Sequence, residues 1–91
     1  TKKDEVLARQ YFEKAASRGD NRASFNLAMM EEQKKNYMGA YQWYELSTRD
    51  GMLDNKVISL SEGKKTALAA NLTQEQIRQA RDRADKWIQA Q

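Results

Sequence analysis

One sequence pattern occurs twice in this chain, first at residues 8–19 and again at residues 40–51. The first copy reads Ala-x-x-Tyr-Phe-Glu-x-Ala-Ala-x-x-Gly, and the second reads Ala-x-x-Trp-Tyr-Glu-x-Ser-Thr-x-x-Gly. The copies are 32 positions apart throughout, within the range of about 20–50 residues that is typical of stacked repeat proteins. The pattern therefore predicts a repeat architecture. Because helical repeats mostly present surfaces for binding, it also favours an interaction function over catalysis.

The composition permits long helices and excludes several kinds of active site. The 91 residues include no proline, so no residue rigidly breaks a helix. They also include no cysteine and no histidine, which removes thiolate nucleophiles, the usual zinc ligands and the commonest general base. No stretch approaches the ~20 apolar residues of a membrane span. We therefore expect one all-α domain over residues 1–91 that is not an enzyme and binds no cofactor and no metal.

The content and balance of charged residues also favour an all-helical domain. Charged residues make up 32% of the chain and leave a net charge of only +3, which is typical of helices that expose most of their faces to water. Basic residues of the C-terminal segment are interleaved with acidic ones, and Arg78 with Asp82 and Arg81 with Asp85 are predicted to pair across one helical turn. A nucleic-acid-binding surface usually clusters its positive charge more strongly. We therefore do not expect a nucleic acid as the partner.

Helical periodicity and capping residues together predict five helices, at about 4–18, 21–34, 37–49, 54–70 and 73–90. Gly19 and Gly51 follow the first and third of these, where glycine readily ends a helix. Thr73-x-x-Gln76 reads as a capping box at the start of the last helix. Gly63 lies inside the fourth predicted helix, where it indicates either close helix packing or an interruption.

A longer set of positions in the first copy continues into the following helix. They are Ala8, Tyr11, Phe12, Ala15, Ala16, Gly19, Asp20, Ala23 and Leu27. Together with Asn36-Tyr37-x-x-Ala40-x-x-Trp43-Tyr44, this pattern resembles the Sel1-like repeat of bacterial proteins, a relative of the tetratricopeptide repeat (TPR). The segment from Leu72 to Trp87 resembles the helix that commonly ends such arrays. Ser47-Thr48 departs from the Ala-Ala of the family, and a glycine-rich insertion is missing before Tyr37.

The resemblance implies a fold and an interaction surface. The fold is a short α-solenoid of two Sel1-like, TPR-like helix-pair repeats, about 4–34 and 36–70, plus a C-terminal capping helix, about 73–90. Such solenoids line a concave groove with the first helix of each repeat. Helical spacing then places the following residues on the groove as contacts to a partner protein or peptide: Arg9, Glu13, Tyr37, Tyr41 and Glu45. Tyr41 is either an exposed interface anchor or a partly buried residue that fills the turn between the units.

Other conspicuous residues are assigned to the structure. The core is predicted to include the aromatic residues Tyr11, Phe12, Trp43, Tyr44 and Trp87. The four methionines, Met29, Met30, Met38 and Met52, are interpreted as fillers at helix junctions. Glu31 and Glu32 are adjacent in sequence and so point about 100° apart on a helix, which does not suit a shared metal ion.

The sequence thus predicts a non-enzymatic protein-protein interaction module with a concave groove. Resemblance to bacterial Sel1-like proteins implies an adaptor or scaffold role, or that of an immunity protein that neutralises a toxin, in a periplasmic or secreted protein; a cytoplasmic location is the alternative. The chain begins with Thr1, which fits a processed form or a part of a longer chain. The alternative function is therefore a structural terminal fragment of a longer repeat array with no ligand of its own. The oligomeric state stays open.

Overall fold

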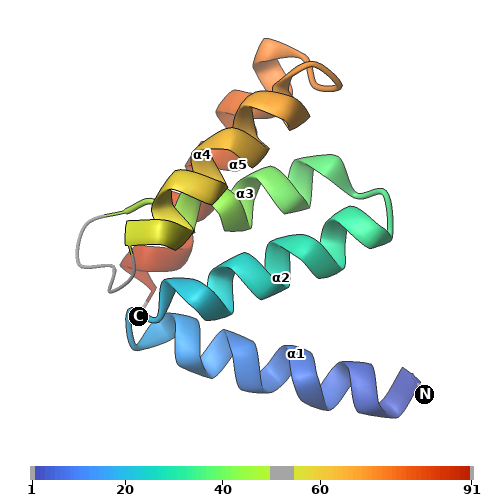
Figure 1. The fold of residues 1–91 in the computed structure, drawn as a ribbon, viewed down its shortest axis with the longest axis vertical. Helices are drawn as coiled ribbons and strands as arrows, with labels where there is room; N and C mark the ends of the chain where they lie inside the picture. The colour runs from blue at the N-terminus through green and yellow to red at the C-terminus, as the bar shows by residue number, and fades with distance from the viewer. Residues whose placement is uncertain (1, 50–54, 91) are drawn as a thin grey trace.

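The computed structural model describes residues 2–49 and 55–90, and in these ranges all regular structure is helical. The helices are α1 (Lys2–Ser17), α2 (Asn21–Gln33), α3 (Tyr37–Ser47), α4 (Asn55–Ala69) and α5 (Gln74–Gln89). The prediction of an all-α chain is confirmed for this part. Figure 1 shows α1, α2 and α3 running back and forth in turn, with short connections between them. None of the described helices is both long and apolar enough to cross a membrane.

Side-chain caps set the starts of three helices close to the predicted positions. The Asp20 carboxylate accepts a hydrogen bond from the Arg22 backbone N–H at the start of α2, and Asn36 accepts one from the Gly39 N–H at the start of α3. At α5 both hydrogen bonds of the predicted capping box between Thr73 and Gln76 are present. Each cap satisfies backbone N–H groups that the first turn of a helix leaves without partners.

Two glycine predictions have different outcomes, and a third lies outside the described residues. Gly19 ends α1 with φ of 88°, a left-handed conformation that glycine adopts without steric cost. Gly63 lies in the uninterrupted helix α4, and a Cβ added there would meet nothing within 4 Å. Both interpretations of Gly63, close packing and interruption, are therefore wrong. Gly51 and the predicted first residue of the fourth helix, Asp54, lie outside the described residues.

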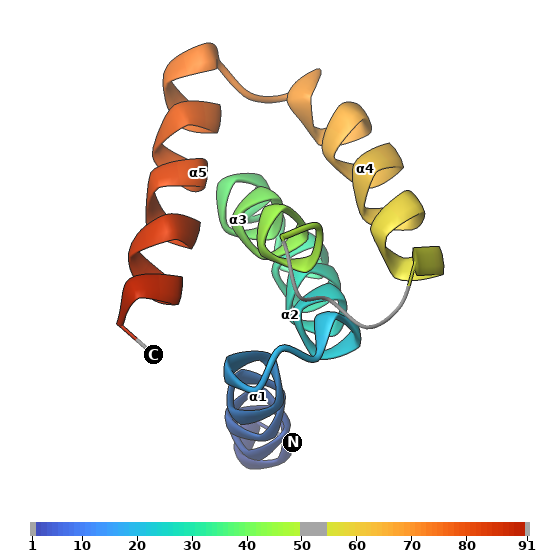
Figure 2. The same ribbon diagram turned by 90° about the vertical axis from the view of Figure 1, so that its left-hand side faces the viewer.

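The core lies between α2 and α3, and α4 and α5 cover opposite sides of α3 (Figure 2). Leu27 and Ala28 of α2 and Ala40 and Tyr44 of α3 are completely buried. The ring of Phe25 meets that of Tyr44 edge to face, with centroids 5.4 Å apart. Burial raises the pKa of the Tyr44 hydroxyl to about 12, with a further contribution from the charge of Glu32. Tyr44 therefore stays neutral over the range in which the protein is handled.

A small polar cluster joins α2, α3 and α4 inside this core. Ser47 is completely buried, and its hydroxyl donates to the Tyr44 carbonyl and accepts a hydrogen bond from the Ser61 hydroxyl of α4. The Asn21 side chain donates to the Ser47 carbonyl at 3.4 Å. Buried polar groups of this kind are tolerated because they are hydrogen-bonded. The cluster accounts for a serine at the position where the resemblance expects alanine.

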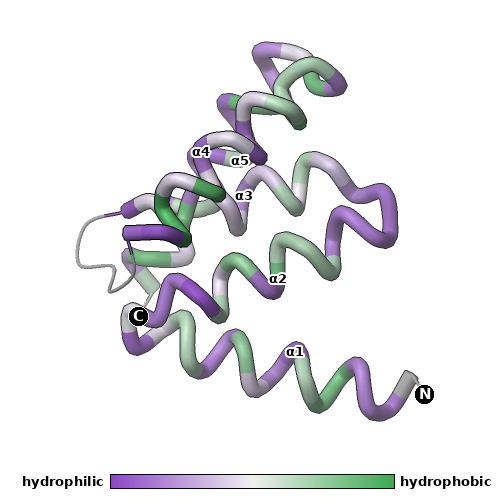
Figure 3. Tube along the Cα trace, in the orientation of Figure 1, coloured by the Kyte–Doolittle hydropathy of each residue, from purple (hydrophilic) through white to green (hydrophobic). Residues whose placement is uncertain are grey.

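The aromatic core prediction holds in part. Trp43 and Tyr44 are buried, and Phe12 and Trp87 are half-buried and pack against the core. Tyr11 is 70% exposed, so its assignment to the core is wrong. The physical reason is the number of neighbours: α3 has α2, α4 and α5 packed around it, whereas α1 packs mainly on α2. Figure 3 correspondingly shows hydrophobic stretches on α1 at the edge of the molecule.

The ion pairs of α5 also differ from those predicted. Arg81 contacts Glu45 of α3, and Asp85 contacts Arg49 after the end of α3. On α5 itself the pairs are Glu75 with Arg78 and Asp82 with Lys86. Because α5 packs beside α3, part of its charge pairs between helices instead of along its own surface. The side chains of Arg78, Arg81 and Lys86 remain mostly exposed, as predicted for a solvated helix face.

Candidate protein-binding groove

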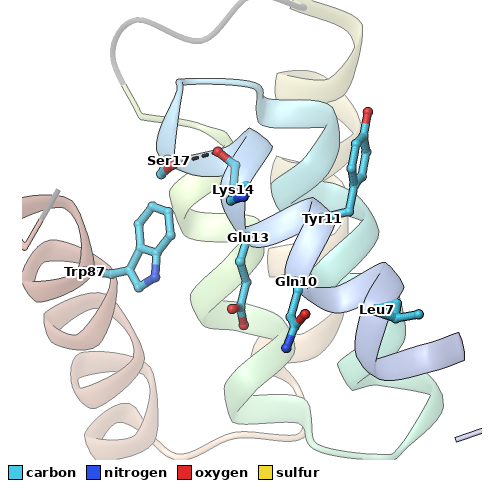
Figure 4. A pocket seen from close by; sticks show the side chains of 7 residues that line it. All are labelled: Leu7, Gln10, Tyr11, Glu13, Lys14, Ser17 and Trp87. Atoms are coloured by element: carbon cyan, nitrogen blue, oxygen red, sulfur yellow. Dashed lines mark hydrogen bonds between the residues drawn. The ribbon is translucent and has the colours of Figure 1, made fainter. Parts of the chain in front are cut away.

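An open groove of about 630 Å³ runs along α1 and reaches the C-terminal half of α5. Its lining residues are Leu7, Gln10, Tyr11, Glu13, Lys14, Ser17 and Trp87. In Figure 4 the Trp87 ring reaches from α5 toward the C-terminal end of α1, while Leu7 and Tyr11 lie on the far side of α1. The surface therefore mixes apolar rings, an apolar branched side chain and groups of both charges.

The packing of α5 on α3 places Trp87 at the edge of this groove. Ala80 and Ala84 are completely buried, and Trp87 follows Ala84 at a spacing that keeps it on the same helix face. Its ring meets Trp43 edge to face, with centroids 5.3 Å apart and planes at 74°. One part of the Trp87 ring is thus fixed by the core, and the part that lines the groove is presented at low conformational cost.

The α1 side of the groove is held by a polar cluster at the junction of α1, α2 and α3. Arg9 Nε lies 3.3 Å from Glu13 Oε1, and the Arg9 guanidinium also pairs with the buried Glu31 carboxylate. Glu31 accepts a second hydrogen bond, from Asn36 Nδ2 at 2.7 Å. Asn36 in turn caps α3 through its other atom, Oδ1. This chain of contacts positions Glu13 relative to the start of α3.

The electrostatics of Glu31 follow from these partners. Burial acts to raise its pKa, but hydrogen bonds from Arg9 and Asn36 and the positive charges of Arg9 and Lys34 outweigh that effect. The net result is a pKa below the usual range, so Glu31 is ionised near neutral pH. Glu31 is therefore an anion that fastens α1 onto the rest of the molecule. The sequence interpretation did not assign it this role.

The five residues that were predicted to contact a partner lie in different environments in the structure. Glu13 lines the groove, and Arg9 lies beside it as its ion-pair partner. Tyr37 is half-buried and packs against the core. Tyr41 is only 8% exposed and belongs to the core cluster, so its side chain is not the exposed one that the anchor interpretation requires; it lies within α3 and not in a turn between the units. The expected alignment of Tyr41 and Glu45 on an open surface is thus not found.

Glu45 is a buried centre of charge and not an exposed groove residue. It is 6% exposed, and its carboxylate lies 3.1 Å from Lys65 Nζ of α4, 3.2 Å from Arg49 Nε and 3.5 Å from Arg81 Nε of α5. Lys65 also donates to the Thr48 hydroxyl. Because the Glu45 carboxylate forms ion pairs with Lys65 of α4 and Arg81 of α5, it links both helices to α3. This explains why a residue on the predicted groove helix is not available to a partner.

Tyr11 and Trp87 are groove residues that the sequence interpretation placed in the core, and Leu7 lines the groove beside them. Their apolar character and helical spacing match those of core residues, so the sequence carries no signal that separates the two roles. Exposure depends instead on which helices lie beside α1. In the described ranges, no group of three or more acidic side chains is placed to hold a metal ion.

The chain matches no known family model, and no curated protein or solved structure shows significant similarity to it.

Proposed function

We propose that this chain is a non-enzymatic protein-interaction module that binds a partner protein or peptide in the groove between α1 and α5. The observation that carries the proposal is the partly exposed Trp87 ring, held against Trp43 and facing the open groove along α1. Tryptophan and tyrosine are enriched at protein interfaces because they bring large, rigid contact areas with a polar tip. Tyr11, exposed along the same groove, adds a second aromatic contact.

A two-repeat solenoid of the Sel1-like type, closed by α5, is the architecture we propose for this function. In the described ranges α1 packs on α2, α2 on α3 and α3 on α4, and α2 also contacts α4 while α5 packs on α3. Contact with both the next helix and the one after it is how stacked helix pairs bury a continuous core. Ala40, the counterpart of Ala8 in the second copy, is completely buried, which supports a small residue at a helix contact.

The chemistry of the groove indicates the kind of partner. The apolar contacts come from Leu7 and Tyr11 of α1 and Trp87 of α5, and the polar contacts come from Gln10, Glu13 and Lys14 of α1. An amphipathic peptide or helix, with apolar anchors flanked by polar groups, would match such a surface. An adaptor or immunity role in the periplasm, or in a secreted protein, is the form this function takes in the bacterial proteins that the repeat resembles.

The groove can be tested by blocking it with a side chain that the fold tolerates. Ser17 is exposed and lies at the end of α1 across from Trp87, so Ser17→Arg fills the groove without entering the core. Ser59→Arg, on the exposed surface of α4, is the matched control. We expect affinity capture from a lysate of the source cells, read by mass spectrometry, to lose its specific protein with Ser17→Arg and to keep it with Ser59→Arg. Equal recovery with both variants would contradict the groove as the binding site.

The alternative is a structural role at the end of a longer repeat array. It is favoured by the exposed apolar side chains of α1, Val6, Leu7 and Tyr11, which a preceding repeat would cover. A longer reading frame with further Ala-x-x-Trp-Tyr copies before Thr1 would support this alternative.

A further inference from the structure

The outer face of α1 carries a row of four residues that can pair with the same four residues of a second copy of the chain. Asp4, Leu7, Tyr11 and Lys14 follow each other at alternating spacings of three and four, so they lie along one side of the helix. This side points away from α2, because Arg9 and Ala16, which contact or pack toward the interior, lie on the opposite side. Leu7 is 57% exposed and Tyr11 is 70% exposed.

We propose that two copies of this chain associate through this row, with the two α1 helices antiparallel about a two-fold axis. With Leu7 placed opposite the partner's Tyr11, Asp4 falls opposite the partner's Lys14, and the symmetry repeats both contacts. The two apolar pairs form the centre, and an ion pair closes each end. A two-fold interface requires this kind of match, in which the same patch serves both subunits.

The positions of Asp4 and Lys14 favour a second copy of this chain as the partner of the outer face of α1. They also favour the antiparallel orientation of the two helices. A parallel arrangement would bring Lys14 against the partner's Lys14 and Asp4 against the partner's Asp4, and both contacts would be repulsive. The antiparallel arrangement turns both into attractions, and it also aligns the helix dipoles favourably. This inference goes beyond the proposed groove function. Leu7, Tyr11 and Lys14 also line the groove, so a second copy and the proposed partner would compete for them, whereas Trp87 stays outside the dimer interface.

The test is the molar mass of the full chain by sedimentation equilibrium over a concentration series at low salt. We expect the mass to rise from 10.5 kDa toward twice that value as concentration increases. Lys14→Glu and Asp4→Lys each place like charges opposite one another, and each should raise the dimer dissociation constant about tenfold or more. The double variant, Asp4→Lys with Lys14→Glu, restores opposite charges and should restore the dimer. Lys35→Glu, an exposed change outside α1, is the control.

The charge exchange also separates a lost interface from a lost fold. Helicity measured by circular dichroism should fall only slightly in the α1 variants, because Asp4 in the first turn and Lys14 in the last turn of α1 are exposed and each interacts with the helix dipole by under about 1 kcal/mol. Lys35→Glu should leave helicity unchanged. A chain that stays monomeric at every concentration would overturn the proposal and leave the face of α1 to another occupant. A dimer that tolerates both single reversals, or that the double variant fails to restore, would overturn it equally. Binding in the groove is read separately with Ser17→Arg, so failure of one proposal is distinguishable from failure of the other.

Discussion

Trp43 and Trp87 meet edge to face, with ring centroids 5.3 Å apart and planes inclined at 74°. The contact joins α3, in the centre of the molecule, to the C-terminal half of α5. Edge-to-face aromatic pairs of this kind contribute about 0.5–1.5 kcal/mol beyond the burial of their area. Trp87 therefore has two roles, in the packing of the last helix and in the lining of the groove.

Trp87→Ala should lower the free energy of unfolding by about 2 kcal/mol, because the side chain is half-buried and a complete core deletion of tryptophan costs about 3–5 kcal/mol. Ile88→Ala is the matched control on the same helix, since Ile88 is 41% exposed; it should cost under about 1 kcal/mol. Urea denaturation followed by circular dichroism measures both. Equal losses in the two variants would show that α5 is not fastened through the tryptophan pair.

Tyr41→Ala should destabilise the protein far more than Tyr11→Ala, although the sequence interpretation placed Tyr11 in the core and left Tyr41 either exposed or partly buried. Tyr41 is buried in the core and should cost about 3 kcal/mol of unfolding free energy on truncation. Tyr11 is exposed, and its truncation should change stability by less than about 0.5 kcal/mol. Thermal or urea melts of the two variants, compared with the parent, check this. A Tyr11 variant as unstable as the Tyr41 variant would place both rings in the core.

Gly63→Ala should stabilise the protein by about 0.5–1 kcal/mol. Alanine loses less conformational entropy than glycine in a helix, and the added Cβ has open space around it. Gly39→Ala is the instructive contrast, because its Cβ would lie 2.5 Å from Asn36 Nδ2 and 3.2 Å from Glu31 Oε2. That variant must displace the Asn36 side chain, which caps α3 and hydrogen-bonds Glu31, and we expect it to be destabilising. The melting temperatures of the two variants should therefore move in opposite directions.

Stability should decrease in acid partly because of Glu31. Its folded-state pKa is lowered, since hydrogen bonds from Arg9 and Asn36 and the nearby positive charges outweigh the effect of burial. A carboxylate with a lowered folded pKa contributes stability that is present above its unfolded pKa and is lost as the pH falls through its folded pKa. Glu31→Gln should be less stable than the parent at neutral pH, and its stability should fall less steeply in acid. Glu62→Gln, on the exposed surface of α4, should keep the profile of the parent.

The local chemistry of the sequence determined where α2, α3 and α5 begin and where α1 ends. Asp20, Asn36 and Thr73 cap helices in the structure, Thr73 as its capping box predicted, because a cap is a contact between a side chain and the backbone two or three residues away. Gly19 ends α1 for the same local reason, its freedom to adopt positive φ. Such features do not depend on how the helices pack against one another.

Burial of the repeated positions was decided by the tertiary structure alone. Glu13 and Glu45 occupy the same position in the two copies, yet their side chains are 42% and 8% exposed. Tyr11 and Trp43 differ in the same way, with one on the surface and the other in the core. The local sequence is nearly the same in each case, but α3 is enclosed by α2, α4 and α5, whereas α1 packs mainly on α2. The periodicity of a helix shows which residues share a face, and only the neighbouring helices determine whether that face meets protein or water.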